Sequence, residues 1–585
     1  MEDISRRSFL TGAVAVAGIA ATAGLAGCAP QQTSEATAGS SAQAAPAGSG
    51  KSDHRPNASM VGRCTQQIEE SDIVNTMETE LLIVGAGNAG MAAAVLATDL
   101  GIDFVVAEKA GAVGATRNWY GAVNIPECAE AGKEVDTVKL NNVLRQAFGG
   151  KNDMRVVKVW LDESADTHAW VKQIMSDYGY EVSFDSDQGL GHGGVGIDMY
   201  VPPIQVNYNA REDCPEEYAK LKRNELFEDY INKQGHEVTY GFDLVKLTTD
   251  DAGAVTGAIF DTKEGYVHVK ARNTLMTTGG YAANAEMLDS LNPILSKCLT
   301  ASDWTPGNTG MGIKAALWAG AMKDPQSAAF VFDRGAVEPG TKAGWTQQSL
   351  ENGEPMLPAT GQFNPGSQPF LKMNLHGERF FNESANYDWA PHAAASQPGG
   401  VYLEVWDAGF AEDIERFHSL GCASLTRVMV NTVGMGTDGY LQEWIDKGIV
   451  VKADTLEELA DGLKLEGAHK EAFLATIERY NELYDAQEDV DFGKEPYLLS
   501  QIRTAPFYGV TLGGTLLDTS DGLRINADMQ VLDTNAEVIP GLYAAGNCGG
   551  SVFADGYYNL THGMACGRAL TFARHAVNHI AGTKA

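Results

Sequence analysis

The Gly-Ala-Gly-Asn-Ala-Gly sequence at residues 85–90 constrains the fold more than any other feature of this chain. It follows an apolar run of strand length, residues 80–84, and precedes an alanine-rich helical segment, residues 91–100. A second apolar run, residues 104–107, ends at Glu108. Glycines at this spacing allow a tight turn, close approach of a phosphate to the backbone, and packing of helix on strand, and the terminal carboxylate can accept hydrogen bonds from ribose hydroxyls. The pattern predicts a βαβ unit that binds a dinucleotide.

Length and charge narrow the class of protein. The chain has 585 residues, of which 44% are hydrophobic, so it can build a large core divided between two or more domains. Its 43 Lys and Arg residues face 76 Asp and Glu residues, which gives a formal net charge of -33. Such a charge repels polyanions, so no nucleic-acid partner is expected.

The N-terminus has the pattern of an export signal. Residues 5–10, Ser-Arg-Arg-Ser-Phe-Leu, resemble the twin-arginine motif, and the apolar stretch at residues 11–27 is too short and too weakly hydrophobic for a permanent membrane span. Residues 25–28, Leu-Ala-Gly-Cys, resemble a lipoprotein cleavage box, although a chance cysteine in an ordinary signal gives the same pattern. We expect a signal at residues 1–28, export through the twin-arginine pathway, and a lipid anchor at Cys28 that holds the protein in the periplasm or on the outer face of the cytoplasmic membrane.

Residues 29–75 are expected to form a disordered linker. From residue 29 to residue 60 the chain consists mainly of Ala, Ser, Gly, Gln and Pro, with almost no large apolar side chains. Such a segment cannot bury enough apolar surface to offset the entropy lost on ordering.

The cysteines do not encode an electron-carrying or metal centre. Apart from Cys28 they stand at positions 64, 128, 214, 298, 422, 548 and 566, and no two of them form a C-x-x-C pair. The spacing therefore provides no clustered iron–sulfur site, zinc ribbon or C-x-x-C-H haem site, and we expect no metal. Electrons must then come from a separate protein or a diffusible donor. One or two disulfides are possible in an exported protein, but their pairing is open.

Further apolar patterns place strands and helices along the chain. Residues 255–260 and 267–278 are typical of strands that return to the first sheet, and residues 156–176 and 471–486 have helical patterns. The last part, residues 538–581, combines a turn, a short strand, a glycine loop and a long helix. The expected fold class is α/β.

Five segments in order resemble the fumarate reductase/succinate dehydrogenase flavoprotein superfamily, which includes urocanate reductases and 3-ketosteroid Δ1-dehydrogenases. They are the Glu108-Lys109 pair with the loop at residues 111–116, the Thr-Thr-Gly-Gly-Tyr sequence at 277–281, the glycine-rich residues 307–312 with 319–321, the cap-type motif at 374–383, and the Ile-Pro-Gly-Leu-Tyr-Ala-Ala-Gly sequence at 539–546. The resemblance covers residues 79–581. It implies a Rossmann-like FAD-binding domain, residues 76–284 and 500–585, with an inserted α+β cap domain for the substrate, residues 285–499.

The same resemblance implies where FAD binds. Gly279, Gly280 and the Gly546-Asn547 turn would lie against the flavin, with a helix N-terminus directed at its ring system. No histidine stands between Glu108 and Asn124, where some relatives attach FAD covalently, so non-covalent binding is expected. The full set of predicted cofactor residues is Gly85, Gly87, Asn88, Ala89, Gly90, Glu108, Lys109, Gly114, Ala115, Thr116, Gly279, Gly280, Gly546 and Asn547.

The chain departs from the fumarate reductase pattern at three positions. Where the reductases carry an Arg that is thought to donate the proton, this chain has Tyr387, and two further cationic or proton-bearing positions align with Asp518 and Leu560. If an ungapped alignment holds, the pocket does not grip a dicarboxylate; a displacement by a few residues is the alternative. The candidate catalytic residues are Tyr387, Tyr558, His562, Asp518 and Arg379, and for Arg379 a structural ion pair is the competing interpretation.

These observations favour reduction of an activated C=C bond in a small unsaturated substrate. Hydride would come from flavin N5, a side chain would donate the proton, and a cytochrome or quinol-linked membrane protein would supply the electrons. The alternative is a 3-ketosteroid-type dehydrogenase that acts on CH–CH groups in the reverse direction. A third possibility, a ligand-binding lipoprotein with a vestigial flavin site, conflicts with the complete glycine motif.

Overall fold

The computed structural model describes residues 68–114, 118–184, 186, 200, 202–303, 307–349, 353, 355–386, 388–417, 437–557 and 561–583, all within the unit His54–Ala585. The predicted signal lies outside these residues. The predicted linker extends too far, because Glu70–Asp72 form a 3-10 turn and strand β1 begins at Ile73, where it pairs with Tyr266. The ordered chain thus begins before residue 76.

The first sheet contains the predicted βαβ unit. Its strands run in the order β17-β18-β9-β1-β2-β6, and β8 adds to β9 and pairs with β7. The pairs β1/β2, β1/β9, β9/β18 and β2/β6 are parallel. The bounds are β1 (Ile73–Val84), β2 (Phe104–Glu108), β6 (Val238–Tyr240), β7 (Asp243–Thr249), β8 (Val255–Thr262), β9 (Gly265–Met276), β17 (Gln530–Leu532) and β18 (Val538–Ala544).

The parallel strands bring distant segments to one edge of this sheet. Val84, the last residue of β1, pairs with Ala107 of β2 and with Met276 of β9, and Met276 pairs with Ala544 of β18. Since parallel strands end at the same edge, the loops that follow them meet there, and ligands of open α/β sheets bind at this edge. The segments that leave it are residues 85–90, 108–114, 277–281 and 545–549.

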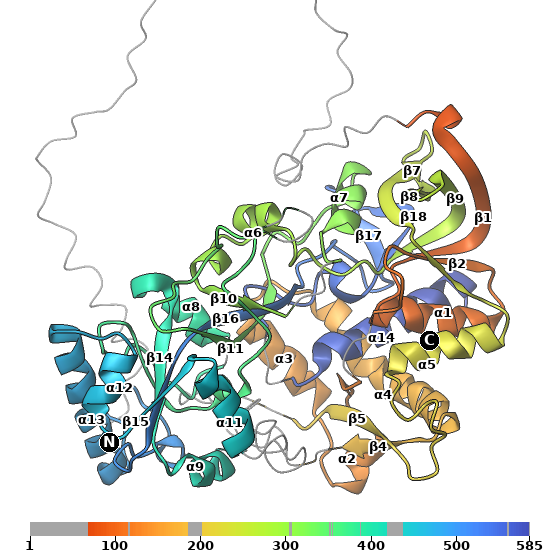
Figure 1. The fold of residues 1–585 in the computed structure, drawn as a ribbon. Helices are drawn as coiled ribbons and strands as arrows, with labels where there is room; N and C mark the ends of the chain where they lie inside the picture. The colour runs from red at the N-terminus through yellow and green to blue at the C-terminus, as the bar shows by residue number, and fades with distance from the viewer. Residues whose placement is uncertain are drawn as a thin grey trace, which may run out of the picture. The chain divides into compact units, whose positions relative to one another are not determined.

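Helices pack together beside this sheet. Helix α1 (Asn88–Leu100) contacts α14 (Met564–Ala581) and α5 (Arg223–Lys233), and α14 also contacts α4 (Met154–Asp177). Figure 1 shows α1 and α14 side by side, although 463 residues of sequence separate Leu100 from Met564. The alanines of α1 are buried, and small side chains allow this close approach.

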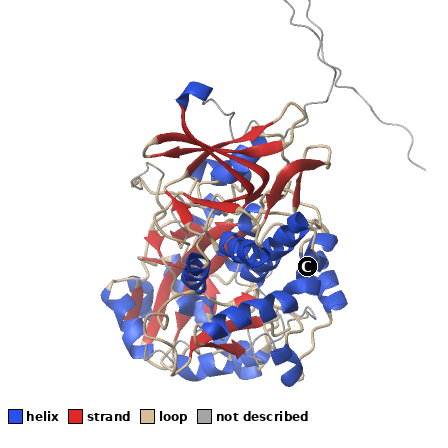
Figure 2. Cartoon of the chain, turned by 90° about the vertical axis from the view of Figure 1, so that its right-hand side faces the viewer, coloured by secondary structure: helices blue, strands red, loops and turns tan. Residues whose placement is uncertain are grey.

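A second sheet is built around the long strand β16 (Phe507–Thr519). Its strand order is β12-β10-β16-β14-β13, and β11 and β15 pair with β16. Figure 2 shows one group of strands, in red, at the upper end of the view and further strands among the helices below it. The bounds are β10 (Leu299–Ser302), β11 (Ala329–Val337), β12 (Ala359–Thr360), β13 (Leu371–Met373), β14 (Tyr402–Trp406) and β15 (Val450–Ala453). Thus β16 lies with strands of the predicted cap; the division at residue 500 stays a prediction.

A small third sheet and further helices complete the described chain. The order β3-β5-β4 joins β3 (Tyr120–Gly121), β5 (Gln205–Ala210) and β4 (Tyr180–Phe184). The other α-helices are α2 (Pro126–Glu130), α3 (Thr137–Ala147), α6 (Ala285–Leu291), α7 (Met311–Trp318), α8 (Trp389–Ala394), α9 (Phe410–Arg416), α11 (Thr437–Asp446), α12 (Leu456–Gly462) and α13 (Ala468–Ala486). In the described ranges, no helix has the length and apolar character needed to cross a bilayer.

The α/β fold class is confirmed. Strands β8 and β9 lie at the two apolar runs predicted to return to the first sheet, and α4 and α13 contain the helical patterns at 156–176 and 471–486. The predicted C-terminal turn, strand, glycine loop and helix correspond to β18, the 3-10 turn Gly546–Cys548 and α14.

Candidate functional site

The three glycines after β1 have three different surroundings. Gly85 has a φ of +103°, and a Cβ there would lie 2.8 Å from the carbonyl oxygen of Thr277. A Cβ on Gly90 would lie 1.8 Å from the carbonyl oxygen of Gly85. A Cβ on Gly87 would meet no atom within 4 Å, and Gly87 is the N-cap of α1. Gly85 and Gly90 therefore serve the turn and its packing, whereas Gly87 borders open space where helix amides can bind phosphates.

Glu108 is held at the end of β2 by two backbone amides. Its Oε2 accepts a hydrogen bond of 2.7 Å from the Ala86 amide, and its Oε1 accepts one of 2.8 Å from the Ala110 amide. Each carboxylate oxygen keeps further lone pairs, so both can also accept hydrogen bonds from hydroxyls. Lys109 donates to Thr309, 3.4 Å away, and the amide of Gly114 donates to the carbonyl of Ala86. The position of Glu108 fits the predicted ribose contact.

A buried arginine that the sequence did not single out lies beside the glycine turn. Arg223, at the start of α5, is 1% exposed and donates to Asn88 Oδ1 at 2.7 Å and to the Asn118 carbonyl at 2.6 Å. Asn224 donates to the same Asn88 oxygen and to the carbonyl of Gly114. In the described part of the chain Arg223 has no ion pair with a carboxylate; its guanidinium also donates to Cys566 Sγ at 3.3 Å, and its Nε has no hydrogen-bond partner. A cation here suits the diphosphate of a dinucleotide.

The two segments predicted to face the flavin ring are joined by one carboxylate. Asp518, in β16, accepts hydrogen bonds from the Gly280 amide at 3.2 Å and from Asn547 Nδ2 at 2.7 Å. A Cβ on Gly280 would lie 2.5 Å from Asp518 Oδ1, and one on Gly279 would lie 2.8 Å from Asn308 Oδ1. Ala89 of α1 lies against Gly546. The predicted cofactor segments thus meet at the edge of the first sheet.

Asp518 is buried within this network, which differs from the substrate-facing position that its alignment suggested. Burial raises the pKa of Asp518 to about 6, although hydrogen bonds from Asn547, Thr519 and Gly280 lower it. Since the described neighbours occupy both oxygens, the geometry is that of a residue that positions two loops. Its catalytic role stays a prediction.

His562 lies in the loop before α14 and is buried without a hydrogen-bond partner. The side chain is 2% exposed, and neither ring nitrogen makes a hydrogen bond to any residue that the structure describes. The neighbouring Gly563 carbonyl accepts a bond of 2.7 Å from Gly121, which fixes the loop against β3. Burial lowers the pKa of His562 to about 4, so the ring is neutral at neutral pH. Two unpaired buried nitrogens are expected to find a partner in a bound molecule.

We expect His562 to make the protein sensitive to acid. Its folded-state pKa lies below the ordinary value of 6.5, so its contribution to stability is fully present above pH 6.5 and is lost as the pH falls toward 4. The free energy of unfolding should fall by about 3 kcal/mol from this group alone. Urea unfolding at pH 7 and at pH 4 measures the loss; His562→Phe, which cannot titrate, should lose less than the wild type. An equal loss in both proteins would contradict the assignment.

An aromatic cluster adjoins the His562 loop. Phe330, Phe553 and Tyr557 pack edge to face, with ring centroids 4.8, 5.3 and 5.6 Å apart. Tyr557 Oη lies 3.3 Å from the Thr561 carbonyl and 3.5 Å from the Ala565 amide, so it spans the loop that carries His562. This wall is apolar and suits a flat, uncharged surface.

Asp388 connects this loop to the start of α8. Its Oδ2 accepts from the Tyr557 amide at 3.3 Å and its Oδ1 accepts from Asn386 at 2.7 Å. Burial raises the pKa of Asp388 to about 7. The carboxyl group therefore changes its protonation near neutral pH, beside the residue predicted to donate the proton.

Arg379 has the geometry of a structural ion pair. Its guanidinium binds both oxygens of Glu383 at 2.7 Å and Asp489 at 2.7 Å, and Lys494 lies 3.5 Å from Glu383. The rings of Tyr480 and Phe492 cover it. These contacts match the structural interpretation that the sequence left open; its catalytic role is not tested.

Four predicted site residues lie outside the described chain. They are Tyr387, Tyr558, Ala115 and Thr116, together with the aligned position Leu560. Their roles remain predictions.

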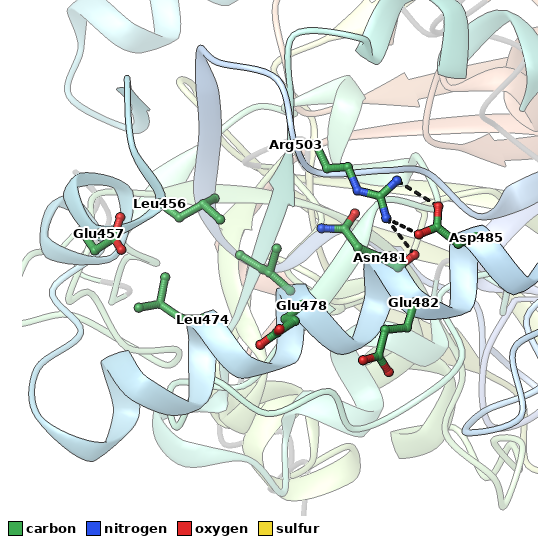
Figure 3. Close-up of a pocket in the computed structure, with 9 residues that line it drawn as sticks. Leu456, Glu457, Leu474, Glu478, Asn481, Glu482, Asp485 and Arg503 are labelled. Carbon is green, nitrogen blue, oxygen red and sulfur yellow. Dashed lines mark hydrogen bonds and ion pairs between the residues drawn. The ribbon is translucent and has the colours of Figure 1, made fainter.

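A surface groove is lined by residues between positions 456 and 503, outside the segments predicted to bind FAD. It runs along α12 and α13, with Leu456, Leu474 and Ile477 as its apolar part and acidic side chains along its rim. Figure 3 shows Arg503 bound to Asp485, at 2.6 Å. The groove contains none of the predicted site residues, so it is not the cofactor site.

The described residues contain no cluster of three or more His, Cys, Asp or Glu that could hold a metal ion. The cysteines at 128, 214, 298, 548 and 566 are unpaired, and Cys64 and Cys422 lie outside the described residues.

The geometry at the sheet edge fits FAD. Open space at Gly87, the orphaned Arg223 Nε and the oriented Glu108 carboxylate provide a diphosphate and ribose site. The joined segments at Gly280 and Asn547, with the orphaned His562 nitrogens, provide a second polar region for the ring system.

Comparison with known proteins agrees with this assignment. The family described as FAD binding domain matches residues 80–561. Vinyl phenol reductase of Lactiplantibacillus plantarum is 26% identical over 512 residues, which cover 86% of this chain and 96% of that protein. Fumarate reductase (cytochrome) of Shewanella frigidimarina is 26% identical over 511 residues, which cover 85% of this chain and 76% of that protein.

A solved structure shares the fold. The 3-ketosteroid Δ1-dehydrogenase of Sterolibacterium denitrificans has a TM-score of 0.63 and 17% identity, over 87% of this chain and 100% of that one. The family match spans most of the chain and the glycine, carboxylate and loop geometry fits its cofactor, so the protein belongs to the FAD binding domain family and is an FAD-dependent oxidoreductase.

Proposed function

We propose that the protein reduces an activated C=C bond of a small, uncharged or aromatic substrate, with FAD as the hydride source. The observation that carries this proposal is the neutral, unpaired His562 beside the wall of Phe330, Phe553 and Tyr557. A site for a dicarboxylate needs cationic groups that reach the substrate, whereas the cation packed on this wall, Arg568, is directed to the carbonyls of Gly546 and Gly549. The similarity to vinyl phenol reductase and to fumarate reductase supports a C=C bond as the reacting group.

Each side chain has a role in this proposal. When bound, FAD supplies the hydride for one alkene carbon. Tyr387 or Tyr558 donates the proton to the other carbon, and the carboxyl group of Asp388, the residue that follows Tyr387 in the sequence, restores that proton. His562 hydrogen-bonds a carbonyl or hydroxyl of the substrate. The aromatic wall excludes water from the reacting bond.

The electron supply and location complete the proposal. The chain is exported by the twin-arginine signal, anchored through Cys28, and receives electrons at the outer face of the cytoplasmic membrane from a cytochrome or quinol-linked protein. The motifs at residues 5–10 and 25–28 support export and anchoring, and the lack of C-x-x-C pairs in the sequence supports an external donor. The relative named fumarate reductase (cytochrome) supports a haem protein as that donor.

The proposal is tested by anaerobic reoxidation of the reduced protein. FAD in the purified mature protein is reduced chemically, and its absorbance near 450 nm is followed after addition of fumarate, urocanate, cinnamates, vinyl phenols or enone steroids. Rapid reoxidation by an aromatic or enone compound but not by fumarate is expected. Reoxidation by fumarate alone would overturn the substrate class. Reduction of oxidised FAD by a saturated steroid would establish the dehydrogenase alternative.

Tyr387→Phe should slow this reoxidation at least tenfold, because it removes the proposed proton donor and leaves the ring in place. The FAD content and the reduction step should stay as in the wild type. An unchanged rate would exclude Tyr387 as the donor. Tyr558→Phe in the same assay then tests the second candidate.

FAD is proposed to bind without a covalent bond, since no histidine stands between residues 108 and 124. Precipitation of the protein with acid should release all of its yellow colour into the supernatant. Flavin that stays with the pellet after washing in denaturant would contradict the proposal.

A further inference from the structure

Arg568 is a fully buried cation with neutral partners. It lies on α14 and is 0% exposed. Its guanidinium donates to the carbonyls of Gly546 at 2.9 Å and Gly549 at 3.0 Å, and to Asn547 Oδ1 at 3.2 Å. The Phe553 ring covers it, with 4.8 Å between guanidinium carbon and ring centroid. Its Nε is buried and has no hydrogen-bond partner among the described residues.

Three of the six buried Lys and Arg residues in the described chain have a carboxylate beside them, whereas Arg568, Arg223 and Arg334 do not. Lys323 pairs with Asp521, Lys372 with Glu404, and Lys494 with Glu383. No carboxylate in the described ranges lies within 4.0 Å of Arg568. Burial lowers the pKa of Arg568 to about 10, so it remains charged at neutral pH. Two carboxylates, Asp324 and Asp518, favour its charged form from beyond that distance. A buried cation without a direct ion pair is unfavourable, and an anion that binds nearby lowers that cost.

The contacts of Arg568 lead to the segments that fit the flavin ring. Asn547, which accepts from Arg568, donates to Asp518, and Asp518 accepts from the Gly280 amide. Arg568 is thus tied to both ring-facing segments through one chain of hydrogen bonds. Arg223, another buried arginine without a carboxylate, lies beside Asn88 instead, at the diphosphate end.

We propose that Arg568 is a positioning residue that raises the reduction potential of bound FAD by stabilising the negative charge of its reduced ring. Two electrons from the external donor and one proton convert FAD to FADH⁻, so the ring gains one negative charge. A fixed cation in a low-dielectric surrounding stabilises that charge more than it stabilises the neutral oxidised ring. The external electron donor can then be a weaker reductant than the one needed to reduce free flavin.

The carboxylate of Asp518 carries a negative charge within the same hydrogen-bond network, so its effect on the reduction potential of FAD should be opposite to that of Arg568. When its carboxyl group is ionised it disfavours the reduced ring, so its removal should raise the potential where removal of Arg568 lowers it. The groups that surround Asp518 are Asn308, Asn547, Thr519 and the Gly280 amide, and the titratable groups that interact with it are Tyr281, Cys548 and Arg568. If the two residues had a purely structural role, their removal would not shift the reduction potential of FAD in opposite directions.

The test is the potential of FAD in the loaded full-length protein at pH 8, measured by equilibration with redox dyes. In Arg568→Met the ratio of reduced to oxidised FAD at a fixed dye potential should fall at least tenfold, which is about 30 mV for two electrons. Arg568→Lys should stay near the wild type, and Asp518→Asn should shift the ratio in the opposite direction. Arg479→Met, at an exposed arginine of α13, is the matched control and should change nothing.

Two outcomes would overturn the proposal. One is a ratio of reduced to oxidised FAD in FAD-loaded Arg568→Met that stays within twofold of the wild-type ratio at the same dye potential. The other is a downward or absent shift in Asp518→Asn, which decides the matter if Arg568→Met does not fold. The inference depends on FAD binding and not on the substrate, so failure of the reoxidation assay leaves it standing, and its own failure leaves the proposed reaction standing.

Discussion

Gly87→Ala is expected to fold like the wild type and to purify without flavin. A Cβ at this position meets no protein atom within 4 Å, so the methyl group causes no clash in the folded chain. The same methyl group occupies the space at the N-cap of α1 through which a diphosphate reaches the helix amides. The affinity for FAD should fall roughly a hundredfold or more, about 3 kcal/mol. Flavin absorbance per protein and titration of the apoprotein with FAD measure this loss.

Gly90→Ala is the matched comparison, because the same methyl group at this glycine acts on the fold. Its Cβ would lie 1.8 Å from the carbonyl oxygen of Gly85, so the turn and α1 must separate. We expect a lower melting temperature and loss of flavin together, whereas Gly87→Ala keeps the melting temperature of the wild-type apoprotein. Full FAD occupancy in Gly87→Ala would show that the cofactor does not use this turn.

The sequence predicted the first sheet because its signals are local. The apolar runs, the glycine spacing and the terminal Glu108 all lie within 29 residues, residues 80–108, and each has a direct geometric meaning. The pairing of β16 was harder to anticipate. This strand lies after the predicted cap boundary but pairs with β10, β11, β14 and β15, since sheet partners are chosen by tertiary packing.

The charged residues of the interior could not be recognised from the sequence. Arg223 and Arg568 stand in helical segments, where an arginine is ordinarily expected to be solvated. Their burial follows from the contacts of α1 with α5 and α14, which no local pattern encodes. For Asp518 the sequence suggested a functional position, and the structure gives it different surroundings. Alignment placed it at a position for substrate contact, but the structure surrounds it with Gly280, Thr519 and Asn547.

Arg379 was foreseen as one of two possibilities, and its surroundings explain why the sequence could not decide. Its partner Glu383 is four residues away in the same motif, but Asp489 and Lys494 come from more than 100 residues later in the chain. A catalytic arginine and a structural one have the same local sequence, and only the distant partners distinguish them.

Glu383→Gln is expected to destabilise the protein by about 3–5 kcal/mol, because it removes the anion shared by two buried cations. Glu383 is 4% exposed and Lys494 is 2% exposed, so water cannot replace the lost charge. Burial alone would raise the pKa of Glu383, but Lys494 and Arg379 hold it below its usual value, which shows that the ionised form is favoured. Unfolding in urea at pH 7, followed by circular dichroism, measures the loss.

The control is Glu482→Gln on α13, where the partner Arg479 and the carboxylate are both exposed. Exposed pairs contribute little because water and salt screen them, so this variant should unfold at the wild-type urea concentration. Burial lowers the pKa of Lys494 to about 8 even though Glu383 raises it, so loss of Glu383 should lower this pKa further. The destabilisation of Glu383→Gln should therefore decrease as the pH rises toward 8, because the unpaired lysine loses its charge. Equal stability of the two variants would mean that Arg379 and Lys494 find other counter-charges once Glu383 is gone, and the ion-pair cluster would then not account for the stability of this part of the fold.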